Sequence, residues 1–226
     1  MRCWSADGRP CDLADVLELA PSNPARVIAA VGAGGKTSTL YDLAAAGAAR
    51  GLSCVVTTTT HMSLRPDLLT DLQTILDGLG QGRILTVGRQ LGDHKFGPLA
   101  PSEMRIIRQE TDLILVEADG SRQLPLKVPA EHEPVIPAEA DTLLVLLGLS
   151  ALDRPLAEVC HRESFARKIV EGDLATAANC ARLLNEGYLK NDKVLRWQDR
   201  QKAVFVVLNQ ADDESRRRQG KVIASG

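Results

Sequence analysis

Aromatic residues are scarce in this chain, at 3% of its 226 residues. Few flat side chains are therefore present to stack on a nucleotide base, so the sequence leaves any choice of base open. Long apolar runs are missing too: residues 143–149 form the longest, and a bilayer requires about 20 residues. The chain also begins without the apolar stretch of a signal peptide. We therefore expect a cytoplasmic protein with no membrane partner.

Neither an excess of positive charge nor a pattern of paired cysteines is present. The formal net charge is −2, which argues against the basic field that nucleic-acid-binding proteins use. We interpret the short basic cluster Arg216–Arg218 as a solvated helix face and expect no nucleic-acid partner. The five cysteines are scattered and include no C-x-x-C pair, so neither a disulfide framework nor a zinc ribbon is indicated.

The strongest motif is a glycine-rich segment that follows the apolar run Val27–Val31. It ends in Gly-Lys-Thr, which predicts a strand, a phosphate-binding turn and a helix. Lys36 would carry a positive charge to the β- and γ-phosphates of a nucleoside triphosphate, and the Thr37 hydroxyl would ligate Mg²⁺. The usual pattern starts with a glycine where this chain has Ala30. The residues predicted to bind the nucleotide here are Gly32, Ala33, Gly34, Gly35, Lys36, Thr37 and Ser38.

Short apolar runs alternate with helical patterns along the chain. Continuous apolar runs are typical of strands buried on both faces of a parallel sheet. The sequence thus predicts an α/β fold: a doubly wound, mostly parallel sheet in a P-loop NTPase-like three-layer sandwich. We treat residues 1–226 as a single domain with a Pro-rich loop at 122–140 and a small helical insertion at about 150–200. The predicted strands are Val27–Val31, Cys54–Thr59, Ile84–Val87, Leu113–Glu117, Thr142–Leu147 and Ala203–Leu208, and Val222–Gly226 has the pattern of a strand entering a loop. The predicted helices are Lys36–Arg50, Ser102–Gln109, Ser164–Glu171 and Leu174–Asn185.

Ligands of such sheets bind beyond the carboxyl ends of the strands, so the residues that follow each strand are candidates. The second strand runs into threonines and then His61. We expect Thr59 or Thr60 to contact Mg²⁺ or a phosphate, and His61 to act on the substrate. A structural histidine bonded to the backbone is the alternative for His61.

The fourth strand leads into two acids, Glu117 and Asp119. Carboxylates at this edge are suited to holding Mg²⁺ and positioning a nucleophile, so both are predicted as metal ligands and as catalytic residues. An ordinary Asp-Gly turn is the alternative. After the sixth strand, Asn209 and Asp212 resemble the base-reading element of GTPases. Gln210 replaces the lysine of that element, so both ATP and GTP stay open.

Several of these segments together resemble a known family, the selenium-dependent hydroxylase accessory proteins (YqeC-like). The resemblance spans about residues 12–226, and its most specific part runs from Glu117 to Pro137. It implies a P-loop nucleotide-binding protein linked to the maturation of molybdenum hydroxylases that carry labile selenium. A molybdenum hydroxylase, or one of its cofactor-maturation proteins, is the implied partner. The segments that carry it are Val31–Thr37, Thr57–His61, Glu117–Ser121, Leu124–Lys127, Glu131–Pro137 and His161–Arg162.

Three hypotheses follow. The first is an accessory protein that hydrolyses ATP or GTP with Mg²⁺, using Lys36, Glu117, Asp119 and His61 as catalytic residues. The second is a small-molecule kinase or NTP-dependent ligase. The third is a non-catalytic module that delivers a cofactor or selenium, with Cys160 a better carrier than Cys54, which lies in a predicted strand. In the second hypothesis His61, Lys127, His132 and Arg162 would line an acceptor pocket, and Arg154 or Arg162 would neutralise developing phosphate charge.

Overall fold

The computed structural model describes residues 2–5, 7–198 and 202–225. Its centre is a seven-stranded sheet in the order β14-β12-β3-β10-β4-β7-β6. All neighbouring strands in it run parallel, and the six strands predicted from the sequence are confirmed to within two residues. The strands of this sheet are β3 (Arg26–Gly32), β4 (Cys54–Thr58), β6 (Leu68–Leu69), β7 (Ile84–Val87), β10 (Leu113–Glu117), β12 (Thr142–Gly148) and β14 (Ala203–Asn209).

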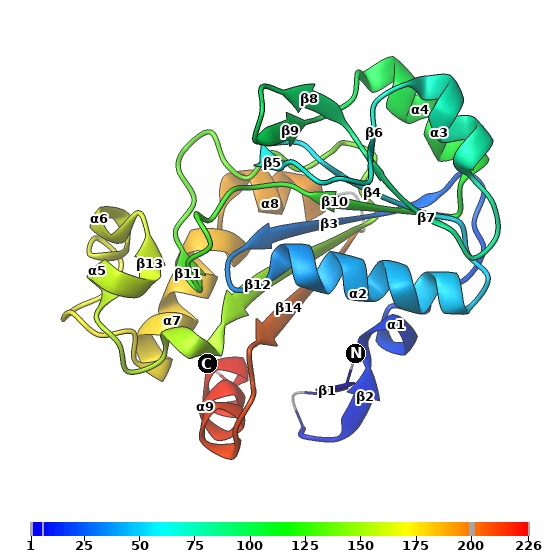
Figure 1. Ribbon diagram of the computed structural model, residues 1–226. Coiled ribbons are helices and arrows are strands. Elements are labelled where there is room, and N and C mark those ends of the chain that lie inside the picture. The colour runs from blue at the N-terminus through cyan, green and yellow to red at the C-terminus, as the bar shows by residue number, and fades with distance from the viewer. Residues whose placement is uncertain (1, 6, 199–201, 226) are drawn as a thin grey trace.

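Helices cover both faces of the sheet (Figure 1). The side chains of β3 alternate between the faces: Val27 and Val31 join one core cluster, and Ile28 joins the other. Every helix from α3 to α9 contributes residues to the first cluster, and α1 and α2 contribute residues to the second. The predicted doubly wound three-layer α/β sandwich is therefore confirmed. The helices are α1 (Leu13–Val16), α2 (Lys36–Ala49), α3 (Leu72–Gly78), α4 (Pro101–Glu110), α5 (Leu156–Val159), α6 (Glu163–Ala166), α7 (Ala177–Leu184), α8 (Asp192–Gln198) and α9 (Glu214–Ala224).

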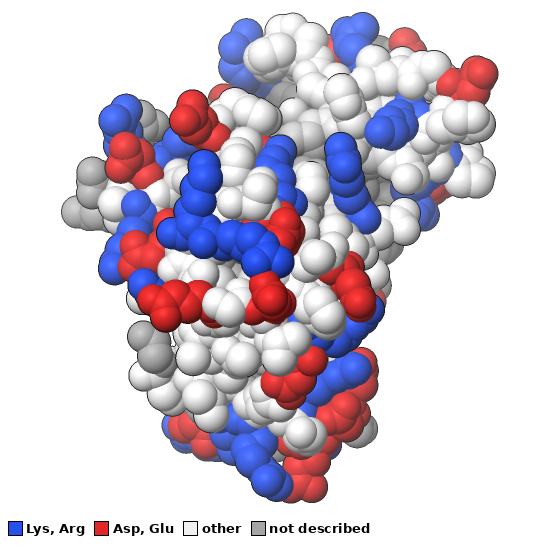
Figure 2. Space-filling view, turned by 90° about the vertical axis from the view of Figure 1, so that its left-hand side faces the viewer, with Lys and Arg blue, Asp and Glu red and all other residues white. Residues whose placement is uncertain are grey.

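Short elements outside the main sheet complete the fold. A 3₁₀ turn, η1 (Leu149–Ala151), follows β12, and a π-helical turn, η2 (Asn185–Leu189), extends α7. None of the helices in the described residues is both long and apolar enough to cross a bilayer. Lys, Arg, Asp and Glu side chains intermingle on the face shown in Figure 2, in keeping with the small net charge. The small strands are β1 (Arg2–Trp4), β2 (Pro10–Asp12), β5 (Met62–Ser63), β8 (Arg89–Leu91), β9 (Lys95–Gly97), β11 (Leu126–Lys127) and β13 (Cys160–His161).

Two predicted helices are shorter or shifted. The helix predicted at Ser164–Glu171 is limited to α6. After it, Lys168 and Ile169 donate to carbonyls only three residues earlier, as in a turn, and Gly172 then reverses the chain with a φ of 76°. The helix predicted at Leu174–Asn185 begins only at Ala177. The Thr176 side chain caps it by accepting from the Asn179 N–H, and the preceding Leu174 forms a β-bridge instead.

The strand predicted at Val222–Gly226 is wrong. Residues up to Ala224 belong to α9, which Asp213 starts by accepting a hydrogen bond from the Arg216 N–H. The apolar pair that suggested a strand is divided by the helix, since Ile223 is buried and Val222 is 58% exposed. Gly226 itself lies outside the described residues.

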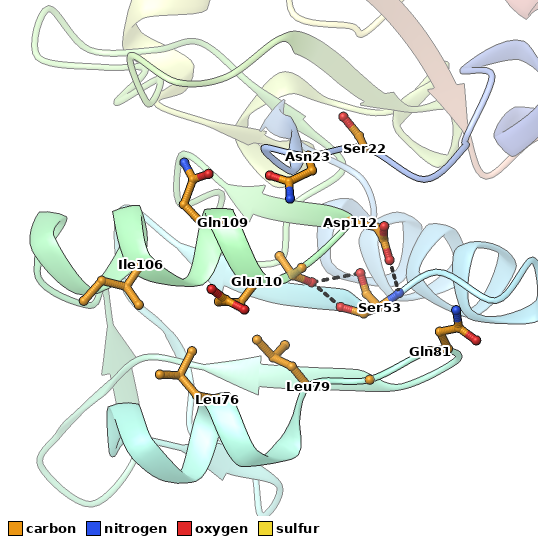
Figure 3. Close-up of a pocket in the computed structure, with 12 residues that line it drawn as sticks. Ser22, Asn23, Ser53, Leu76, Leu79, Gln81, Ile106, Gln109, Glu110 and Asp112 are labelled. Atoms are coloured by element: carbon orange, nitrogen blue, oxygen red, sulfur yellow. Dashed lines mark hydrogen bonds between the residues drawn. The ribbon is translucent and has the colours of Figure 1, made fainter.

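A cavity of about 470 Å³ lies at the amino edge of the sheet (Figure 3). Ser53 and Asp112, the residues just before β4 and β10, line it, and the Ser53 N–H donates to Asp112 Oδ2 over 2.9 Å. Ligands of parallel sheets bind at the opposite, carboxyl edge. The phosphate-loop motif lies at that carboxyl edge, so this cavity is separate from it.

Candidate functional site

The phosphate-loop motif forms the turn between β3 and α2. The N–H groups of the four residues from Gly35 to Ser38 make no hydrogen bond with any described residue. Free N–H groups at a helix start are donors for an anion, and the helix dipole adds positive potential there. The earlier N–H groups are used inside the protein: Ala33 donates to Leu146 O over 2.9 Å, and Gly34 donates to Leu124 O over 3.2 Å. Gly32 to Gly34 therefore shape the loop, and Gly35 to Ser38 offer the donors.

The glycines that the turn requires begin at Gly32, which explains why Ala30 fits. Ala30 is fully buried inside β3 and forms part of the strand ladder, so no turn occurs there. Gly35 has a φ of 108°, and a Cβ placed on it would lie 2.4 Å from Asn209 Nδ2. A side chain at position 35 is thus disfavoured both by the backbone conformation and by Asn209.

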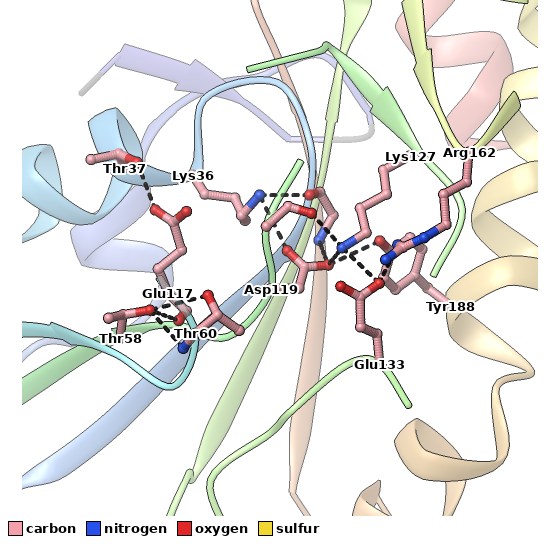
Figure 4. Close-up of polar contacts among 12 residues, drawn as sticks. Lys36, Thr37, Thr58, Thr60, Glu117, Asp119, Lys127, Glu133, Arg162 and Tyr188 are labelled. Carbon is pink, nitrogen blue, oxygen red and sulfur yellow. Dashed lines mark hydrogen bonds and ion pairs between the residues drawn. The ribbon is translucent and has the colours of Figure 1, made fainter. Parts of the chain in front are cut away.

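Lys36 turns back into the loop (Figure 4). It is only 3% exposed, and its Nζ donates to Gly32 O over 2.7 Å. The same Nζ forms an ion pair with Asp119 Oδ1 at 3.2 Å. The loop lysine is therefore held by a carboxylate from the segment that follows β10.

Thr37 and Glu117 form a hydroxyl–carboxylate pair at the carboxyl end of β10. The Thr37 hydroxyl donates to Glu117 Oε2 over 2.6 Å. Burial raises the pKa of Glu117, although the charge of Lys36 and the Thr37 hydrogen bond act in the opposite direction. A hydroxyl and one carboxylate fit Mg²⁺, which commonly takes one or two protein ligands and fills the rest with water and phosphate oxygens. Within the described residues, no group of three or more His, Cys, Asp or Glu side chains is arranged to hold a metal ion alone.

Asp119 lies beyond β10 and is fully buried. Its Oδ2 accepts from the Gly32 N–H over 3.0 Å and from the Tyr188 hydroxyl over 3.1 Å, and it pairs with Lys127 Nζ at 3.0 Å. Tyr188 is supplied by η2, and π-helical turns are frequent at functional sites. Burial and the charge of Asp119 raise the pKa of Tyr188 well above its ordinary value, so this hydroxyl stays a donor. These contacts suit Asp119 to holding Lys36 in place.

A chain of buried charges continues from Asp119 into the Pro-rich loop (Figure 4). Lys127 Nζ also lies 3.0 Å from Glu133 Oε2, and Arg162 pairs with the same oxygen. Burial alone would raise the pKa of Glu133, but the bonds from Arg162 and Lys127 outweigh it and lower the pKa to about 2. The Pro-rich loop is thereby fixed to Arg162, the residue that follows β13.

The polar residues after β4 are largely used to brace the sheet edge. The Thr58 hydroxyl donates to Glu117 O and the Thr59 hydroxyl donates to Val135 O, each over 2.8 Å. The Thr60 hydroxyl lies 3.2 Å from that of Thr58. His61 is exposed, and its side chain makes no hydrogen bond with a described residue. The structure therefore does not join His61 to the group around Lys36.

Asn209 and Asp212 have different surroundings. Asn209 Nδ2 donates to Gly34 O over 2.9 Å, which brings the end of β14 against the phosphate loop. Asp212 is exposed and pairs with Arg216 Nη1 at 3.0 Å. Gln210, with a φ of 59°, accepts from the Ser150 hydroxyl over 2.5 Å. Asn209 thus joins the loop, and Asp212 lies on the surface.

Sequence reasoning did not single out Tyr188. Tyr188 reaches Asp119 only because the chain makes a π-helical turn, which no sequence pattern indicated. The mixed charges of the Pro-rich loop, Glu133 among them, suggested a substrate or lid loop, but its ion pairs with Lys127 and Arg162 were not predicted.

Comparison with known proteins decides the family. A family model described as "YqeC protein" matches residues 28–164, which is more than half of the chain. The chain belongs to the YqeC family. It is also 36% identical over 163 residues to a protein of Escherichia coli (strain K12) named "Uncharacterized protein YqeC". That match covers 66% of this chain and 62% of the relative. No solved structure matches the chain significantly.

The part that matches the YqeC model contains most of the buried charge cluster. It includes the phosphate loop and runs through β10, the Pro-rich loop and Arg162. Tyr188 and Asn209, which contact Asp119 and the loop, lie outside the matched residues. Most of the candidate site thus lies in the part of the chain that matches the family model, and the structure adds the contacts made by Tyr188 and Asn209.

Proposed function

We propose that this YqeC-family chain is a Mg²⁺-dependent nucleoside triphosphate-binding protein that hydrolyses ATP or GTP. One observation carries the proposal: free N–H groups at the start of α2 lie beside Lys36 and the Thr37–Glu117 pair. A triphosphate is the ligand that uses all of these groups together. Of the predicted binding residues, Gly32 to Gly34 then shape the loop, and Gly35 to Ser38 offer N–H groups to the phosphates.

In this proposal each residue has a defined role. The N–H groups and Lys36 bind the β- and γ-phosphates, and Thr37 and Glu117 hold Mg²⁺. The metal would neutralise phosphate charge, as it does in other phosphoryl-transfer proteins. Asp119 acts through Lys36, whose position it fixes. Asn209 supports the loop from β14, which leaves Asp212 as the weaker candidate for reading the base.

The cellular role in this proposal is that of an accessory protein in the cytoplasm. Membership of the YqeC family and the resemblance at Glu117–Pro137 support a role in the maturation of selenium-dependent molybdenum hydroxylases. The partner would be such a hydroxylase or a protein that matures its cofactor. Nucleotide hydrolysis would then alter the Pro-rich loop, which the charges around Asp119 connect to the phosphate loop.

A kinase or ligase is the second candidate function. It is favoured by two basic residues near the loop lysine: Lys127 pairs with Asp119, and Arg162 pairs with Glu133. His132 and Arg154 are exposed, so they are less suited to lining a pocket. The third hypothesis, a module that delivers a cofactor or selenium, loses support. Burial raises the pKa of both Cys54 and Cys160 to about 12, which keeps the two side chains as thiols.

Calorimetric titration with GTPγS and with ATPγS, in Mg²⁺, tests the proposal. Lys36→Ala should abolish measurable binding, and Lys95→Ala should not, because Lys95 is an exposed lysine on β9. Retention of full nucleotide affinity by the Lys36→Ala protein would refute the proposal. A preference for guanine would support a role for Asp212, and a preference for adenine would favour the kinase or ligase.

A further inference from the structure

Two short strands bring basic residues together beside the phosphate loop. β11 and β13 run parallel with Lys127 opposite His161, and the Val128 N–H donates to His161 O over 3.2 Å. The turn before β11 touches the phosphate loop, where the Gly34 N–H donates to Leu124 O. Figure 2 shows several Lys and Arg side chains close together on this side of the molecule, with Asp and Glu side chains beside them. The two strands thus place Lys127 and His161 next to the phosphate loop.

Three of the side chains here have unused hydrogen-bonding groups. The Arg162 side chain is 22% exposed, and only its Nη1 is engaged, by Glu133. Arg122 is exposed and makes no hydrogen bond or ion pair with a described residue. The imidazole of His161 also makes none, and its Nδ1 is buried without a partner. By contrast, Lys127 is fully engaged by Asp119, Glu133 and Gly120 O.

The backbone at both arginines is in an unfavourable conformation. Arg122 has a φ of 52°, the following Gln123 a φ of 61°, and Arg162 a φ of 67°. A left-handed conformation is unfavourable for a non-glycine residue. Such conformations persist where the surrounding structure enforces them, and they gather at ligand sites.

The charged side chains around Asp119 and Glu133 include equal numbers of positive and negative groups if Arg122 is left out. Lys36, Lys127 and Arg162 face the carboxylates of Asp119, Glu133 and Glu117. Arg122, whose charge acts on His161, then adds a positive charge that has no carboxylate partner among the described residues. An anionic ligand would balance that excess.

We propose that Arg122, His161 and Arg162 bind the oxyanion of a second, small-molecule substrate, either a phosphate or a carboxylate. This inference rests on the nucleotide binding of the proposed function and extends its kinase or ligase candidate, because it gives the nucleotide an anionic acceptor to act on. Guanidinium groups present paired N–H donors that match two oxygen atoms of an oxyanion. Burial, together with the neighbouring charges of Arg162, Lys127 and Arg122, lowers the pKa of His161. The imidazole is therefore neutral at pH 7 and donates one hydrogen bond.

Titration calorimetry with orthophosphate and with malonate tests this site. The titrations use the Lys36→Ala protein, so that binding at the phosphate loop is weakened. We expect one anion to bind, and Arg122→Gln in the same background to weaken it about tenfold, the value of one charge-assisted hydrogen bond. Arg105→Gln is the matched control, because Arg105 is an exposed arginine on α4 without a side-chain partner among the described residues. Orthophosphate binding would indicate a phosphorylated substrate, and malonate binding a carboxylate.

The outcomes separate this site from the nucleotide site. Equal affinity with and without Arg122→Gln, in proteins whose circular dichroism shows a folded chain, would overturn the inference. So would the absence of binding by either anion. If the unmodified protein binds no nucleotide, but orthophosphate or malonate still binds and Arg122→Gln weakens that binding, the proposed function fails and the anion site stands. If it binds nucleotide normally without an Arg122-dependent anion, only the anion site fails.

Discussion

Lys36 Nζ and Asp119 Oδ1 lie 3.2 Å apart, and both side chains are almost completely buried. Lys36 is therefore already paired within the protein itself. Removing water from two charges is expensive, and their attraction together with further hydrogen bonds must offset that cost. Gly32 supplies such bonds to both partners, through its carbonyl to Lys36 and through its N–H to Asp119. A phosphate that binds Lys36 would share it with Asp119.

Replacing Asp119 with Asn should destabilise the protein strongly. The change leaves Lys36 and Lys127 buried with one carboxylate fewer, and breaking a buried pair in this way costs about 3–5 kcal/mol. Urea denaturation measures the free energy of unfolding. Asp93→Asn is the control, because Asp93 is exposed and makes no ion pair with a described residue. A loss equal to that of the control would show that the buried pair contributes no stability.

The sequence predicted the sheet more fully than the site, for physical reasons. Apolar runs such as that of β12 report burial directly, and Gly-Lys-Thr fixes a local turn. The role of Asp119 depends on contacts with Lys36 and Tyr188, which are distant from it in the chain and meet it only in the folded state. The strand predicted at Val222–Gly226 failed because a short apolar run fits a helix end as well as a strand.

Glu117→Gln should remove the Mg²⁺ dependence of nucleotide binding. In the unmodified protein the carboxylate must be ionised to hold Mg²⁺, and burial raises its pKa. Below that pKa the protonated form prevails and Mg²⁺ binding weakens, so nucleotide affinity in Mg²⁺ should rise with pH across the acidic range. Calorimetric titrations over that range should give a flat profile for the variant. A variant profile that rises as steeply as that of the unmodified protein would assign the Mg²⁺ contact to another group.

Gly35→Ala should reduce both stability and nucleotide binding. The added Cβ would lie 2.4 Å from Asn209 Nδ2, so the contact between Asn209 and Gly34 would be broken in addition to the backbone strain. Gly51→Ala is the matched control, since Gly51 has a φ of 82° and open space around its Cβ position. We expect about 1 kcal/mol of destabilisation at Gly51 and about 2–3 kcal/mol at Gly35. Equal losses of unfolding free energy would show that Asn209 can move aside without cost.

Glu133→Gln should make the protein less stable at neutral pH, by an amount that disappears in acid. The carboxylate has a folded-state pKa of about 2, against an ordinary value of 4.5, so its ionised form favours the folded state. This stabilisation is complete above pH 4.5 and is lost as the pH falls toward 2. The difference in unfolding free energy should be up to about 3 kcal/mol at pH 7. Denaturation at a series of pH values should show the two proteins converging in that window. A difference that stays constant down to pH 2 would mean that Glu133 stabilises the loop without its charge.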